Sequence, residues 1–222
     1  MNILDAIIII VIIVGALGGM SRGLIKEVVF LLSLIVCLVL SFSLRGPIAT
    51  LMYKYLPFFE FSGEYAGVSI LNILVYELIA FLIVFGVLYL IVRILLAISG
   101  LIEKLLKATI ILGFFSKIGG AIVGAIEGYV LVFIILFVLN QPFFHITGIE
   151  NSKVANFILD KTPLMSPVIE DTRIAIKEVY ELSGKYKTNK QQFNKEAIKL
   201  FIKYDIISEE NVEILREKGK LN

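Results

Sequence analysis

Histidine, cysteine and tryptophan are almost absent from this sequence. Its 222 residues hold one cysteine, one histidine and no tryptophan. Cys37 has no partner for an intrachain disulfide, and its place in an apolar run predicts a small buried side chain. His145, just after the last long apolar stretch, is expected to be an ordinary interfacial residue and not a pH-responsive group. The sequence has no His or Cys cluster, phosphate-binding loop or catalytic triad, so we expect no metal, no cofactor and no enzyme activity.

Neither sign of charge dominates the chain, but apolar residues are in excess. The 21 basic and 19 acidic residues nearly balance, so the net charge gives no indication of nucleic-acid binding. Hydrophobic residues make up 58% of the chain, against about 45–50% in soluble domains. Charges are sparse over 1–140 and dense over 141–222. We therefore predict a membrane domain over 1–140 and a polar, mainly helical tail over 141–222.

Four apolar stretches are long enough to cross a bilayer, which needs about 17–25 helical residues. They are Ile3–Gly19, Val28–Leu44, Val68–Val92 and Ile118–Leu139. No basic residue precedes the first stretch and no clear cleavage site follows it, so we expect a retained span and not a signal peptide. The predicted fold is an all-α polytopic membrane protein with four transmembrane helices, and the lipid bilayer is its first expected partner.

Basic residues in the short connections predict the orientation of these spans. The first connection holds Arg22 and Lys26, the third holds Arg93, Lys104, Lys107 and Lys117, and the second holds only Arg45 and Lys54. The first and third connections are therefore predicted to be cytoplasmic, which places both termini outside.

The segment after the third span is predicted to be an amphipathic helix. Its polar positions share one helical face, which suits the headgroup layer of the membrane. These positions are Arg93, Gly100, Glu103, Lys104 and Lys107. Ser99 and Gly100 would form the bend between the span and this helix. The alternative is that the third span continues as one long helix beyond the membrane.

The polar tail carries helical signals of its own. Apolar residues at helical spacing predict helices over Val168–Leu182 and Gln191–Tyr204. Ser208 is the expected N-cap of a further short helix through Leu215, with Gly219 just beyond its end.

Two sets of glycines recur at every fourth residue beside apolar runs. They are Gly15, Gly19 and Gly23 in the first set, and Gly120, Gly124 and Gly128 in the second. In a membrane helix this spacing exposes backbone along one stripe, so a neighbouring helix can approach closely. We predict that these glycines mark helix-packing surfaces, where leucine would separate the backbones and alanine would be a far milder change.

Seven ionisable residues lie within or beside the spans, where a charge is costly. They are Asp5, Arg22, Lys26, Glu27, Glu77, Arg93 and Glu127. Glu127 is expected to pair with Arg22 or Lys26 of the first hairpin, and Asp5 to reach the interface by snorkelling. Asn72 and Tyr76 are the expected polar neighbours of Glu77. The charges form either a polar pathway or substrate site inside the bundle, or structural pairs that hold a glycine-packed hairpin together.

Two segments carry a family resemblance. The chain opens an apolar run at Leu4 and Asp5, continues with GMSRGLIKE over 19–27, and later carries LGFFSKIGGAIVGAIEG over 112–128. In this order and spacing, residues 1–140 resemble the colicin V production protein family. The resemblance implies a multi-pass protein of the bacterial inner (plasma) membrane, linked to production or export of a peptide toxin and to envelope integrity.

Two functional hypotheses follow. The first is an accessory or scaffold factor in toxin production, export and envelope homeostasis, with a second copy or other envelope proteins as partners and no nucleic acid. The alternative is a small oligomeric transporter or channel that uses the intramembrane charges. Neutralising Glu127, Arg22 or Glu77 would separate the two, since a transporter would lose activity while keeping its abundance and oligomeric state.

Overall fold

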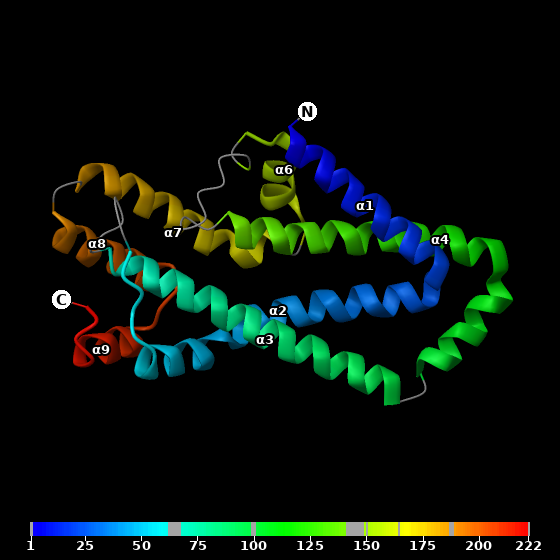
Figure 1. Cartoon of the computed structure of the whole chain (residues 1–222), viewed down its shortest axis with the longest axis horizontal. Helices are drawn as coiled ribbons and strands as arrows, with labels where there is room; N and C mark the ends of the chain where they lie inside the picture. The colour runs from blue at the N-terminus through cyan, green and yellow to red at the C-terminus, as the bar shows by residue number, and fades with distance from the viewer. Residues whose placement is uncertain are drawn as a thin grey trace. The chain divides into compact units, whose positions relative to one another are not determined.

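The described part of the chain consists of helices and their connections (Figure 1). The computed structural model describes residues 2–61, 68–98, 101–140, 149, 151–163, 165–186 and 189–221, and only the backbone over 101–112. The helices are α1 (Ile3–Arg22), α2 (Leu24–Tyr55), α3 (Ile70–Ile98), α4 (Leu101–Leu139), α6 (Lys153–Lys161), α7 (Ser166–Lys185), α8 (Lys190–Lys203) and α9 (Glu209–Glu217). No strand occurs among these residues, which confirms the all-α prediction.

Four helical segments have the length and apolar composition of membrane spans. They are α1, α2, α3 and the part of α4 over Gly113–Leu139. The protein is therefore a polytopic helical membrane protein. α2 is longer than predicted, because it continues through Arg45 and Pro47 to Tyr55. Within this helix, the charge of Arg45 is paired with Glu77 of α3.

α4 bends at Gly113. The φ of 53° and ψ of −125° at this residue are not helical, and the positive φ favours glycine. The bend separates the segment 101–112, which holds Glu103, Lys104 and Lys107 of the predicted amphipathic helix, from the apolar part of α4, whereas Arg93 of that prediction lies in α3. α3 ends at Ile98, and the predicted bend at Ser99 and Gly100 lies outside the described residues. The placement of 101–112 in the headgroup layer stays a prediction.

The chain divides into two compact units, each of which joins distant segments. The first unit consists of Met1–Ser41 and Phe85–Thr162, and the second of Phe42–Val84 and Pro163–Asn222. In the first unit α1 packs along α4 (Figure 1), and α6 contacts both helices. The predicted division at residue 140 rests on polarity and not on compactness, and it stays a prediction.

In the second unit, α7 and α8 pack side by side and bury the apolar faces of the tail. α7 contains the predicted helix, and α8 ends one residue before Tyr204, which is its C-cap. The Ser208 side chain accepts a hydrogen bond from the Asn211 N–H and caps α9. The three predicted tail helices are confirmed, whereas α6 is not among the predictions.

Candidate functional site

Glycines of α1 and α4 bring the two backbones into direct contact. A Cβ atom added to Gly19 would lie 2.1 Å from the carbonyl oxygen of Gly120, and one added to Gly124 would lie 2.3 Å from that of Gly15. Cβ atoms in proteins essentially never approach other atoms within 3.0 Å. Alanine would therefore also force these helices apart, and its smaller cost relative to leucine stays a prediction.

Gly23 differs from the other glycines of the two stripes. It is the single residue between α1 and α2, and its φ of 82° favours glycine. Its Cα also lies 3.0 Å from the place of a Cβ on Gly120, so the turn itself touches α4. Gly128, at the other end of the stripe, is less tight, with 3.1 Å between an added Cβ and the Val11 carbonyl oxygen.

One nitrogen of Arg22 joins two carboxylates. Its Nη2 atom lies 2.7 Å from Oε1 of Glu27 and 3.0 Å from Oε2 of Glu127. The guanidinium thereby links the end of α1 to the first turn of α2 and to the apolar part of α4. The predicted pairing of Glu127 with the first hairpin is confirmed, with Arg22 and not Lys26 as its partner.

Glu27 is the most enclosed acid in this group, because its side chain has no exposed surface. Its Oε1 atom lies 3.0 Å and 2.9 Å from the places that Cβ atoms would take on Gly19 and Gly124. The two glycines therefore make room for the carboxylate as well as for the backbones. Among the described residues, Oε2 of Glu27 and Nε of Arg22 have no hydrogen-bond partner.

Three basic side chains surround the ring of Phe30, which is buried. The distances to the ring centroid are 5.9 Å from Cζ of Arg22, 5.6 Å from Nζ of Lys26 and 4.7 Å from Cζ of Arg93. Cation–π attraction partly offsets the cost of placing these cations in or beside a span. We call the group at the Gly23 turn the elbow cluster: Arg22, Lys26, Glu27, Phe30, Arg93 and Glu127. Sequence reasoning missed Phe30, which carries no polar signal of its own.

Glu77 belongs to a buried group in the second unit. Its Oε2 atom lies 2.9 Å from Nε of Arg45, and its Oε1 atom accepts a hydrogen bond of 2.8 Å from the Tyr53 hydroxyl. The guanidinium of Arg45 also lies 3.9 Å from the ring centroid of Phe42. This group is not in the elbow cluster, and it joins α2 to α3 within its own unit.

The two local polar neighbours of Glu77 in the sequence form their hydrogen bonds elsewhere. The Asn72 amide pairs with the backbone of Phe59, and the Tyr76 hydroxyl donates to the Pro57 carbonyl. Successive residues of a helix point to different sides. Adjacency in the sequence therefore does not bring the Tyr76 hydroxyl to the Glu77 carboxylate.

The Asp5 side chain is buried and does not snorkel, so the prediction that it reaches the interface in that way is wrong. Its carboxylate accepts a hydrogen bond of 2.9 Å from the Asn2 backbone N–H and another from the Ser152 hydroxyl. Ser152 is the N-cap of α6. The unpredicted helix therefore supplies the partner that keeps Asp5 buried. Cys37 is completely buried, as predicted.

The part of the chain that the structure describes holds no group of three or more His, Cys, Asp or Glu side chains that could bind a metal ion. His145 lies outside that part, so its predicted interfacial role stays a prediction.

The residues of the elbow cluster lie within the match to one family model. The family model described as colicin V production protein matches residues 4–163. The chain belongs to the colicin V production protein family. The match extends beyond residue 140 and includes α6. No curated protein and no solved structure matches the chain.

Beyond the colicin V production match, α9 and the residues that follow it bond to the last turns of α2 in the second unit. The Lys220 ammonium donates hydrogen bonds to the carbonyls of Tyr53 and Leu56, in the region where a helix end leaves carbonyls without helical partners. The Thr50 hydroxyl donates to the Asn211 side-chain oxygen at 2.9 Å. Burial lowers the pKa of Lys220, and the nearby Lys218 charge lowers it further.

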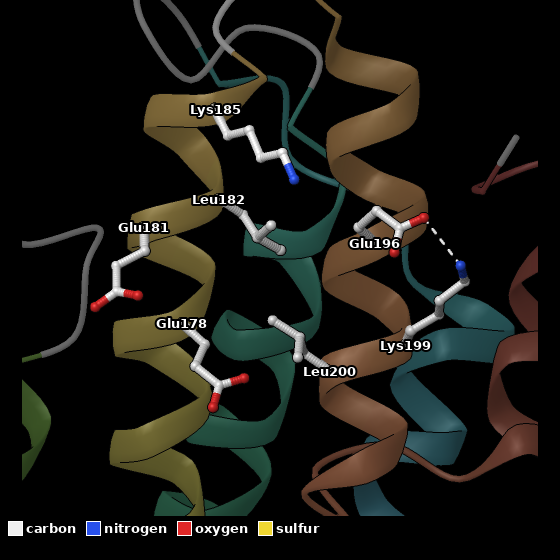
Figure 2. Close-up of a pocket in the computed structure, with 7 residues that line it drawn as sticks. All are labelled: Glu178, Glu181, Leu182, Lys185, Glu196, Lys199 and Leu200. Carbon is white, nitrogen blue, oxygen red and sulfur yellow. Dashed lines mark hydrogen bonds and ion pairs between the residues drawn. The ribbon is translucent and has the colours of Figure 1, made fainter.

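A groove of about 470 Å³ runs between the packed helices α7 and α8, which also lie beyond the colicin V production match. Leu182 and Leu200 point into it from the two helices, and charged side chains line its sides (Figure 2). The Lys199 ammonium pairs with Glu196 at 2.9 Å. At the end of α8, a hydrogen bond to the Tyr204 hydroxyl and the charge of Glu178 raise the pKa of Lys203.

Proposed function

We propose that this member of the colicin V production family is a non-enzymatic accessory or scaffold protein of the bacterial inner membrane. It supports production or export of a peptide toxin and the integrity of the envelope. Family membership supports this context. The observation that carries the scaffold role is the neutralisation of acids in the spans by basic residues of the same unit.

This charge arrangement favours a structural role, in which the charges hold helices together, over a transport pathway. Arg22 holds acids of α2 and α4 together, and the α1 and α4 backbones touch at their glycines. Breaking such a pair would leave one buried charge uncompensated, and the cost of that charge disfavours any state in which the pair is open. The face of α1 away from α4 presents exposed apolar side chains at helical spacing: Ile3, Ile7, Ile10, Val14 and Leu17. Lipid or the helix of a partner would cover this stripe.

Crosslinking in intact membranes tests the scaffold role. A photo-crosslinker at Val14, which is 61% exposed, should capture a stoichiometric protein partner, either a second copy or another envelope protein. The matched control is Ile8 on the same helix, which is 2% exposed and should give no intermolecular product. If exposed positions on α1 and α3 capture no protein at all, the scaffold role is rejected.

One observation favours the transporter alternative. The buried Oε2 atom of Glu27 and Nε of Arg22 have no hydrogen-bond partner among the described residues, and a catalytic or ion-binding role is one explanation for a buried polar atom of this kind. Proton or ion flux into liposomes that contain the full chain distinguishes the two functions. A transporter would lose flux in Glu27→Gln at unchanged abundance, whereas a scaffold would show no flux above that of empty liposomes.

We propose the orientation that the loop charges predict, with the first and third connections in the cytoplasm. A pair of reporters, each active on one side of the membrane only, can be fused after Leu139. The externally active reporter should give the signal. Activity of the cytoplasmic reporter would reverse the orientation.

A further inference from the structure

Among the described residues, two cations of the elbow cluster have no acidic partner. Lys26 and Arg93 lie over the Phe30 ring, at 5.6 Å and 4.7 Å from its centroid. Both acids of the cluster are bound to Arg22. Within the described residues, no carboxylate pairs with Lys26 or Arg93, and only aromatic rings compensate these two charges.

The two cations come from different helices and converge on one ring. Lys26 lies in the first turn of α2, and Arg93 lies near the end of α3. Arg93 is exposed and Lys26 is partly exposed, whereas Phe30 is buried beneath them. Like charges that share one ring repel each other, and this repulsion is stronger at a membrane boundary than in water. An anion between them would remove it.

We propose that Lys26 and Arg93 bind the phosphate of an anionic phospholipid above the Phe30 ring. The surface beside Arg93 favours a lipid over a soluble anion. Leu90 and Ile94, on the same part of α3, are 60% and 47% exposed and offer an apolar surface for an acyl chain. Basic pockets between transmembrane helices recognise anionic headgroups in this way. The site does not depend on the accessory role, since it rests on the described geometry alone.

Thermal unfolding of the full chain in mixed micelles tests the site. Phosphatidylglycerol should raise the unfolding midpoint more than phosphatidylcholine does. Lys26→Gln and Arg93→Gln should each weaken the apparent affinity for phosphatidylglycerol about tenfold or more, because each removes a charge-assisted contact. The matched control is Lys117→Gln, which removes an exposed positive charge near the start of the α4 span, at a residue that is not among the cations over Phe30. It should keep the full stabilisation.

Further variants and ligands make each outcome decisive. Lys26→Arg and Arg93→Lys keep the charge and should retain the lipid effect even if a neutral variant fails to fold. If these variants lose the effect, or Lys117→Gln weakens it as much as the other two, the site is overturned. Inorganic phosphate alone should give no stabilisation. An equal gain from inorganic phosphate would identify a free-anion site and overturn the lipid proposal.

Discussion

The Nη2 atom of Arg22 lies 3.0 Å from an Oε atom of Glu127, although the two residues are 105 positions apart in the sequence. The same nitrogen holds Glu27 at 2.7 Å. One cation therefore compensates acids from α2 and α4, and each acid depends on it. Removing Arg22 would leave two acids uncompensated, whereas removing either acid leaves the other still paired.

We expect Arg22→Gln to destabilise the protein more than Glu127→Gln. Removing one partner of a buried pair costs about 3–5 kcal/mol, and snorkelling or water reduces that cost in a membrane. The Arg22 side chain is 33% exposed. We therefore expect Glu127→Gln to lower the free energy of unfolding by about 3 kcal/mol or less. The free energy of unfolding in detergent would measure both changes.

A double-mutant cycle tests the pair directly. Arg22→Gln combined with Glu127→Gln should lose less stability than the sum of the single losses, because the pair is already broken. Lys54→Gln, at an exposed position, is the control and should change stability by about 0.5 kcal/mol or less. Additive losses in the cycle would reject the Arg22–Glu127 pair.

Gly19→Ala and Gly124→Ala should each destabilise the protein, with leucine at the same positions costing more. An added Cβ would meet backbone atoms of the opposite helix, which cannot move aside like a flexible side chain. Overpacking of this kind costs about 1–3 kcal/mol. Gly86→Ala is the matched control on α3, because a Cβ there meets nothing within 4 Å. It should be neutral or slightly stabilising, and thermal stability in detergent would compare all three variants.

In the second unit, Arg45→Gln should cost more than Tyr53→Phe. The first change leaves Glu77 without its cation, at about 3–5 kcal/mol before membrane relaxation. The second removes one hydrogen bond to a carboxylate, at about 1.5–3 kcal/mol. Unfolding free energies again provide the measurement. Equal effects of the two variants would show that Arg45 does not act as the counter-charge of Glu77.

Folding should shift the pKa values of two tail lysines in opposite directions. The pKa of Lys203 is raised above 10.5 by its hydrogen bond to Tyr204 and by Glu178. Its stabilising contribution is therefore fully present below pH 10.5 and is lost as the pH rises through the folded pKa. The pKa of Lys220 is lowered by burial, so stability rises as the pH increases from that lowered pKa to 10.5.

NMR titration of the two lysine side chains checks both directions. Tyr204→Phe should return the Lys203 pKa toward 10.5 and leave the Lys220 pKa unchanged, because of these two lysines it is Lys203 that contacts the Tyr204 hydroxyl. If the Lys203 pKa is the same in Tyr204→Phe as in the unmodified protein, this hydrogen bond is not the cause of the shift.

The helices were predictable from the sequence wherever a local signal existed. Apolar length predicts the spans, and the Ser208 N-cap predicts the start of α9. The prediction ended the second apolar stretch at Leu44, before the charged Arg45, whose partner Glu77 comes from α3. α6 was not among the predicted helices, and the bond from its N-cap Ser152 to Asp5, 147 positions away in the sequence, is not visible in the sequence.

The elbow cluster was predictable in part. Depth and charge predict that Glu127 pairs with the first hairpin, and the glycine spacing predicts close helix approach. The choice of Arg22 over Lys26, and the shared contact with Glu27, follow from the turn at Gly23 and from the face of α4 that meets it. These are tertiary features that one sequence does not contain. The role of Phe30 depends on α3 in the same way.

The bond from Lys220 to the Leu56 carbonyl spans 164 positions of sequence, and this separation has a consequence for biosynthesis. Ribosomes add about 5–20 residues per second. Lys220 is therefore translated roughly 10–30 s after the end of α2. During that interval its carbonyls are available to water, to lipid headgroups or to a chaperone. The closure of this helix end is thus a late event of synthesis, although α2 is among the first helices to leave the ribosome.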